Sequence, residues 1–316
     1  MVRYLKSGSD ATSAAIRVAR DFTGRDVVVT CGYHGWHDWY VPAMGKTAGV
    51  PDAVQALTLT TPFNDSARLE SLLHAKHHEI AALILEPTGK ETATPEFLHT
   101  CKRLTAHYGI VLVFDEVVTG FRVNLGGAQA HYGVTPDLAC FGKALANGLP
   151  LSVLTGSTTL MSRLEHIFVS STFGGETLSL AAGLATVRKL RELDVPKRLW
   201  AHGETLKQIA NTEFREAGLN HMLQFAGDGW WPRLSVTPGN LDANVVTSLV
   251  RQELVGAGLL LVGGFNLCLA HMSPEIVDKT QKALHSAAAA IRDAVDSPTP
   301  AANIRGDAVR PNFSIR

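Results

Sequence analysis

A short apolar run from Ile110 to Phe114 ends at two carboxylates, Asp115 and Glu116. The run is too short for a globular helix and rich in branched side chains, which is typical of a strand buried on both faces of a parallel sheet. Open α/β sheets bind their ligands at the carboxyl ends of such strands. The pattern therefore predicts an α/β fold in which Asp115 lies at a ligand-binding edge.

A single lysine, Lys143, stands in the nearly charge-free segment from Cys140 to Pro150. An amine in apolar surroundings loses its proton more easily and becomes nucleophilic, so we expect Lys143 to be desolvated. A strand-end acid and a desolvated lysine are the two groups that pyridoxal phosphate chemistry requires. The lysine forms the Schiff base, and the acid keeps the pyridine nitrogen protonated.

The composition is that of an ordinary globular protein of 316 residues, 46% of them hydrophobic and 18% charged, which is enough for more than one domain. Lys plus Arg equals Asp plus Glu at 29 each, so charge gives no case for nucleic acid or a membrane surface as partner. The four cysteines are scattered, which favours reduced thiols in a cytoplasmic protein. The sequence shows no signal-peptide pattern and no apolar segment long enough to span a bilayer.

Buried strands and helices alternate along the first 193 residues, which predicts a parallel sheet with right-handed crossovers. We expect strands at 2–6, 27–30, 80–85, 110–114 and 152–156, and helices at 11–22, 65–77, 95–108, 160–165 and 177–193. Val195-Pro196 is a plausible hinge. The expected domains are 1–193, a small domain at 194–296 and a surface tail at 297–316. In the small domain we expect helices to about 217, at 240–256 and from 273, and strands at 222–226, 233–236 and from Leu259.

The turn Ser7-Gly8-Ser9-Asp10 lies between a predicted strand and a predicted helix. This arrangement offers free backbone N–H groups to an anion such as phosphate, although Ser9 or Asp10 also suits a purely structural N-cap. After the next strand, Tyr33 and His34 are placed to cover a flat ligand ring, or merely to pack in the turn. The spacing of His34 and His37 would allow two metal ligands, but no further ligand cluster fits, so we expect no metal.

Two other interpretations of these patterns fail. An ATPase would need a Walker A loop. Gly45-Lys46-Thr47 has the right ending for such a loop, but the first glycine of the motif is replaced by Tyr40. In the second candidate, Gly142-Lys143, the lysine is followed by Ala144 instead of a hydroxyl residue. A dinucleotide fold would place Gly256-x-Gly258 after a strand, whereas here it precedes an apolar run. The chain also contains no Gly-x-Ser-x-Gly elbow of a hydrolase.

Several motifs in register resemble class III pyridoxal phosphate aminotransferases, and the nearest branch resembles glutamate-1-semialdehyde 2,1-aminomutase. They are residues 7–11 (SGSDA), 33–35 (YHG), 86–87 (EP), 115–122 (DEVVTGFR), 126–130 (GGAQA), 132–138 (YGVTPDL) and 142–143 (GK). The likeness covers most of residues 1–190 and is weaker beyond, where it rests on Gly263, Gly264 and Asn266.

The resemblance implies a fold type I transferase: a large domain with a mostly parallel, seven-stranded sheet, a small α+β C-terminal domain, and a homodimer with shared active sites. It implies pyridoxal 5′-phosphate as cofactor, and a small-molecule amino donor and carbonyl acceptor as partners. It also implies roles for seven residues: Lys143 as Schiff-base lysine, Asp115 at the pyridine nitrogen, Val117 under the ring, Tyr33 over it, Gly8 and Ser9 at the phosphate, and Thr172 at the phosphate of the other subunit.

Three departures from the aminomutase pattern favour an ordinary transaminase with an unassigned substrate. They are residues 86–91 (EPTGKE), the turn 173–176 (FGGE) and a shortened loop at 44–47 (MGKT). The family also carries a substantial segment before the Ser-Gly-Ser motif, whereas Met1 lies six residues before Ser7. Two alternatives stay open: the aminomutase reaction, and a shortened homologue that binds the cofactor without turnover.

Overall fold

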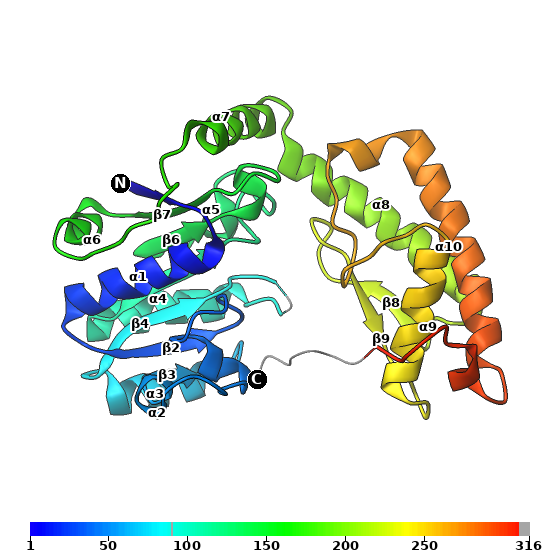
Figure 1. Ribbon diagram of the computed structural model, residues 1–316, viewed down its shortest axis with the longest axis horizontal. Helices are drawn as coiled ribbons and strands as arrows, with labels where there is room; N and C mark the ends of the chain where they lie inside the picture. The colour runs from blue at the N-terminus through cyan, green and yellow to red at the C-terminus, as the bar shows by residue number, and fades with distance from the viewer. Residues whose placement is uncertain (90, 310–316) are drawn as a thin grey trace. The chain divides into compact units, whose positions relative to one another are not determined.

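The computed structural model describes residues 1–89 and 91–309, and the chain divides into two compact units after Leu193. The first unit is built on a seven-stranded sheet of order β1-β7-β6-β5-β4-β2-β3 (Figure 1). Its strands are β1 (Val2–Leu5), β2 (Val27–Cys31), β3 (Thr58–Thr60), β4 (Ile80–Leu85), β5 (Val111–Glu116), β6 (Leu138–Phe141) and β7 (Ser152–Gly156).

Neighbouring strands from β3 through β2, β4 and β5 to β6 pair in parallel, whereas β7 runs antiparallel to both β6 and β1. The carboxyl ends of β2, β4, β5 and β6 therefore meet at one edge, where the N-terminal end of β7 also lies. The predicted α/β architecture with a mostly parallel sheet of seven strands is confirmed.

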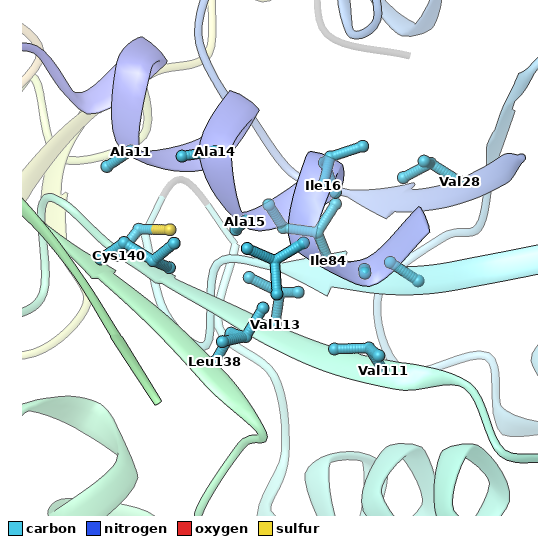
Figure 2. Packing of buried hydrophobic residues seen from close by; sticks show 14 of the residues in the cluster. Ala11, Ala14, Ala15, Ile16, Val28, Ile84, Val111, Val113, Leu138 and Cys140 are labelled. Atoms are coloured by element: carbon cyan, nitrogen blue, oxygen red, sulfur yellow. The ribbon is translucent and has the colours of Figure 1, made fainter. Parts of the chain in front are cut away.

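Helices cover both faces of this sheet. They are α1 (Gly8–Thr23), α2 (Asp52–Gln55), α3 (Ser66–Lys76), α4 (Pro95–Tyr108), α5 (Gly127–Tyr132), α6 (Thr158–Met161) and α7 (Thr177–Glu192), with short 3₁₀ turns η1 (Val41–Met44), η2 (Lys143–Leu145) and η3 (Ser162–Glu165). Small side chains on α1, such as Ala11 and Ala15, let the helix approach Val113, Leu138 and Cys140 of the sheet (Figure 2). Alternate strand residues point to the other face and pack with α3 and α4.

The start of α1 differs from the expectation. Ser7 is its N-cap, not Ser9 or Asp10, because the Ser7 hydroxyl accepts the Asp10 N–H at 3.1 Å and the Asp10 carboxylate accepts the Ser7 N–H at 2.9 Å. This reciprocal capping box satisfies two backbone donors. It also places Gly8 and Ser9 in the first helical turn, where backbone N–H groups have no intrahelical acceptor.

The second unit begins at Asp194 and contains α8 (Val195–Glu216), β8 (Leu223–Ala226), β9 (Arg233–Val236), α9 (Ala243–Gly256), η4 (Leu269–Met272), α10 (Pro274–Val295) and η5 (Pro300–Asn303). The two strands pair antiparallel, and Phe214, Phe225 and Phe265 stack in the core. The expected hinge residue Pro196 lies in the first turn of α8. None of the helices in the described part of the chain is both long and apolar enough to cross a bilayer.

The strand expected from Leu259 is wrong, since residues 259–267 contain no strand. A single isolated bridge joins Gly264 to Arg233, and backbone bonds from Leu234 to Gly263 and from Phe265 to Pro232 hold the segment beside β9. A Cβ on Gly264 would lie 2.2 Å from the Pro232 carbonyl oxygen, so this close approach requires glycine. Paired glycines favour such an irregular contact over a continuous ladder.

Candidate active site

A cavity of about 410 Å³ opens where the carboxyl ends of β4, β5 and β6 meet the N-terminus of α1. Residues 148–151, just before β7, form part of its rim. Six of the seven predicted site residues line it: Gly8, Ser9, Tyr33, Asp115, Val117 and Lys143. Thr172 is not among the lining residues and lies in an exposed turn before α7.

Close backbone contacts shape the end of the cavity at α1. A Cβ on Gly8 would lie 2.8 Å from Cγ1 of Val117, and a Cβ on Gly35 would overlap the Ser9 side chain. Gly35 also has a φ of 107°, a conformation that side chains rarely adopt. Both glycines therefore keep the first turn of α1 open, and Val117 packs directly against it.

Asp115 at the end of β5 is held through both carboxylate oxygens. Oδ1 accepts the Val117 N–H at 3.1 Å, and Oδ2 lies 3.0 Å from Nδ1 of His34. Both side chains are buried. Nε2 of His34 is also buried and has no hydrogen-bond partner among the described residues, so the contact of His34 with Asp115 is made through an N–H on Nδ1. Asp115 then stays an acceptor and can receive one more donor from the cavity.

Lys143 is the first residue of η2, and its φ of 40° lies in the left-handed region. Such strain in a residue other than glycine concentrates at functional sites. The expected desolvation of Lys143 is wrong, because its side chain is exposed. Its neighbours Leu145 and Ala146 instead turn into a separate apolar cluster with Leu151 and Val153. This cluster explains why the segment carries so little charge.

Glu86 follows β4 and brings a second buried carboxyl group to the cavity. Its Oε2 accepts the Tyr33 N–H at 3.0 Å. Burial is the main cause that raises the pKa of Glu86 to about 7, and the charge of Asp115 adds to it, whereas His34 and Lys143 act in the opposite direction. Glu86 therefore changes its protonation state near neutral pH.

Tyr33 connects this acid to the aromatic wall of the site. Its ring meets Tyr40 edge to face at 5.6 Å between centroids. Burial, followed by the charges of Asp115 and Glu86, raises the pKa of the Tyr33 hydroxyl. The phenol therefore stays neutral at physiological pH and offers an aromatic surface inside the cavity.

Glu116 stabilises the loop behind Asp115, a role that the sequence did not reveal. Its buried carboxyl group accepts the backbone N–H groups of Ala128 at 2.7 Å and Gln129 at 2.9 Å, and the Thr119 hydroxyl. Burial raises the pKa of Glu116, and these donors oppose the rise. Gly127 is required beside it, because its φ is 77° and a Cβ would lie 2.6 Å from Oε1 of Glu116. The adjacent glycines Gly126 and Gly127 were the sequence feature that could have indicated this close contact with Glu116.

Residues 1–216 match the family described as aminotransferase class-III. The chain belongs to this family. The resemblance that the motifs indicated is therefore confirmed. The glutamate-1-semialdehyde 2,1-aminomutase of Roseiflexus castenholzii is 38% identical over 248 residues, which are 73% of this chain and 57% of that protein. The 3-aminobutyryl-CoA aminotransferase of Cloacimonas acidaminovorans is 35% identical over 242 residues, which are 74% of this chain and 57% of that protein.

This class-III aminotransferase chain thus spans little more than half the length of those two relatives. Among solved structures, an omega-transaminase from Sphaerobacter thermophilus matches with a TM-score of 0.83 and 30% identity. The match covers 92% of this chain and 74% of the transaminase. The predicted transaminase fold is confirmed by this likeness together with the mostly parallel sheet.

Proposed function

We propose that this class-III aminotransferase binds pyridoxal 5′-phosphate in the cavity and transfers an amino group from a small-molecule donor to a carbonyl acceptor. The observation that carries the proposal is the convergence of Lys143, Asp115 and the first turn of α1 on one cavity. Its volume of about 410 Å³ lies within the usual range for small-molecule sites. The names of the relatives above support the same class of reaction.

The residues present fit this cofactor. Gly8 and Gly35 leave the first turn of α1 open, where its N–H groups and positive dipole end suit a phosphate. Asp115 has both oxygens fixed and spare acceptor capacity, which suits the protonated nitrogen of a pyridine ring. Val117 and Tyr33 offer apolar surfaces in the same cavity.

In this proposal the seven residues keep the roles that the family resemblance implies. Gly8 and Ser9 would hold the phosphate, Asp115 the ring nitrogen and Lys143 the reactive carbon, while Val117 and Tyr33 would enclose the ring. Thr172 would serve the partner subunit, since it lies in an exposed turn away from the cavity of its own chain. Asp115 and Lys143 would then both act on the same bound ring.

When bound, the cofactor supplies a conjugated ring that accepts the electron pair left when a substrate C–H bond breaks. Nζ of Lys143 would take that proton from the substrate carbon as a general base and deliver it to a carbon of the bound cofactor as a general acid. Asp115 would keep the pyridine nitrogen protonated and stabilise the positive charge on it. His34 and the Val117 N–H keep the Asp115 oxygens in place for this task. The donor leaves as a carbonyl compound, and the acceptor leaves as an amine.

The proposal includes a homodimer in the cytoplasm. Exposed apolar side chains lie in the turn that carries Thr172 and on the helix that follows it, with Phe173 66% exposed and Leu178 70% exposed. A second copy of the chain could cover them and receive Thr172. All four cysteines are free thiols, which suits a reducing compartment.

The second candidate function is the aminomutase reaction, in which the amino group moves between adjacent carbons of one molecule. It is favoured by the 38% identity to a protein of that name. The two reactions differ in one requirement, because a transaminase needs an external amino donor and the aminomutase does not.

The test is the visible absorbance spectrum of the purified protein, recorded before and after addition of glutamate or alanine. We expect a cofactor band that falls when a donor is added and recovers with a carbonyl acceptor. Lys143→Ala should abolish turnover, whereas Lys76→Ala, at an exposed lysine on α3, should behave as the wild type.

Each contrary result has a distinct meaning. No band, even with added cofactor, would refute cofactor binding. Full turnover by Lys143→Ala would refute the assigned lysine. A stable band that ignores every donor would favour the aminomutase or a homologue that binds the cofactor without turnover, and reaction of glutamate-1-semialdehyde without a donor would identify the first of these.

A further inference from the structure

Lys6 lies between β1 and the Ser7 cap of α1, and its side chain is only 17% exposed. Its Nζ donates to the Pro150 carbonyl at 2.9 Å and to Oε1 of Glu176 at 2.7 Å, and lies 3.4 Å from the Ser179 hydroxyl. The residue also lines the cavity. One ammonium group therefore joins the start of α1, the rim loop before β7 and the start of α7.

The three acceptors use up the bonding capacity of Lys6. An ammonium has three N–H donors and no acceptor, and each of the three has a protein oxygen nearby. A ligand could gain a bond to this group only by displacing one of them. Lys6 is thus arranged to hold segments of the chain in place, and not to bind a ligand directly.

The partners of Lys6 are themselves fixed. Glu176 caps α7 by accepting the N–H groups of Leu178 at 2.8 Å and Ser179 at 3.0 Å. Lys6 and these hydrogen bonds lower the pKa of Glu176 to about 2, so the ion pair persists across physiological pH. A second bond, from the Ser152 hydroxyl to the Ser7 carbonyl at 2.6 Å, ties the same turn to β7.

We propose that Lys6 is a positioning residue for phosphate recognition. By joining the start of α1 to Pro150 and Glu176, Lys6 fixes the backbone of Gly8 and Ser9 so that the N–H groups of these two residues converge on the phosphate. The inference rests on the proposed function, because it assumes that the cofactor's phosphate lies at the first turn of α1. It adds a residue to which neither the motifs nor the comparisons assign a role.

The test compares two ligands that differ only in the phosphate, pyridoxal 5′-phosphate and pyridoxal. Their dissociation constants are measured by equilibrium dialysis for the wild type, Lys6→Met and the control Lys76→Met. Any contribution of Lys143 is common to both ligands. We expect Lys6→Met to weaken pyridoxal 5′-phosphate by about tenfold or more and pyridoxal by less than about twofold. Lys6→Arg, which keeps the charge and the donors, should restore much of the difference.

An equal loss for both ligands would overturn the inference, because it would indicate a general structural role. No loss for either ligand would overturn it as well. If the wild type itself does not prefer the phosphorylated ligand, both the inference and the proposed phosphate site fail. A preference that the wild type and Lys6→Met share refutes the role of Lys6 alone.

Glu176→Gln keeps the test decisive if Lys6→Met does not fold. This variant removes the negative partner of Lys6 while leaving the lysine and the length of the cap unchanged. The same selective loss of pyridoxal 5′-phosphate is expected, with a smaller magnitude. Wild-type selectivity in Glu176→Gln would contradict the proposed coupling between Lys6 and Glu176.

Discussion

The two sides of the cavity handle charge in opposite ways. On the cradle side, formed by residues 6–9, the Lys6 ammonium meets three acceptors and Glu176 has its pKa lowered to about 2. On the acid side, formed by Glu86, Asp115 and His34, two buried carboxyl groups lie near one another, and the pKa of Glu86 is raised to about 7. The cradle side keeps its charges at neutral pH, whereas the acid side can change.

This difference follows from the number of partners that each carboxyl group has. Glu176 combines a lysine with two backbone N–H donors, which stabilise its ionised form. Glu86 is buried against a like charge and accepts one backbone N–H, from Tyr33. In the proposed function, fixed charges suit the side that would hold the phosphate, and a group that titrates near pH 7 suits the side where protons would move.

The largest expected effect comes from removing the charge of Asp115. Asp115→Asn keeps the shape of the side chain but cannot stabilise positive charge at its partner, so we expect the rate of amino transfer to fall by about 10²–10³-fold. Steady-state kinetics with saturating cofactor measures the fall. The control is Asp38→Asn, at an exposed aspartate. A rate close to that of the wild type would remove Asp115 from the mechanism.

Glu86→Gln should reveal the acid side through stability. Because the pKa of Glu86 is higher in the folded protein than its ordinary value of 4.5, the folded state holds the proton more tightly. The contribution of Glu86 to the free energy of unfolding should therefore be most favourable below pH 4.5. It should fall as the pH rises from 4.5 to about 7. Above pH 7, Glu86→Gln should exceed the wild type by up to about 3 kcal/mol.

Urea unfolding at pH 5.5 and pH 8.5, without added cofactor, measures this difference. The exposed Glu70→Gln on α3 serves as control and should leave the pH dependence of the wild type unchanged. If Glu86→Gln loses as much stability between the two pH values as the wild type does, the raised pKa of Glu86 is contradicted.

The smallest expected effect lies on the cradle side. Ser7→Ala removes the N-cap of α1 and should lower the free energy of unfolding by about 1 kcal/mol, with little dependence on pH. Ser273→Ala removes the corresponding cap of α10 in the second unit and should cost a similar amount. Cofactor affinity should fall in the first variant only. Equal affinities in both variants would mean that the cap of α1 has no part in ligand binding.

Strong hydrophobic patterns and clear boundary residues fixed much of the fold in advance. The predicted strands at 80–85 and 152–156 and the helix at 95–108 match β4, β7 and α4. The three-residue edge strand β3 and the short helix α5 were not predicted, because neither is long enough to show a period. The strand from Leu259 failed because close packing of Gly264 on Pro232 decides the local path there.

The sequence predicted which residues line the cavity, but it did not predict the contacts that these residues make. Motifs pointed to Lys143 and Asp115, yet the exposure of Lys143 depends on where Leu145 and Ala146 pack. The contact of His34 with Asp115 joins residues 81 positions apart, and that of Lys6 with Glu176 joins residues 170 positions apart. Such pairs carry no local pattern, since they arise only when the sheet brings the segments together.

The place of β1 at the edge of the sheet also sets a time for assembly of the site. Its sheet partner is β7, and Val2 pairs with Thr155. At ordinary rates of synthesis the ribosome needs roughly 8–30 s to make the residues between them. During that interval β1 has no strand to join, and the Ser7–Ser9 turn that follows it lacks the bond from Ser152 to the Ser7 carbonyl. Synthesis of β7 therefore completes the edge of the sheet and the rim of the cavity together.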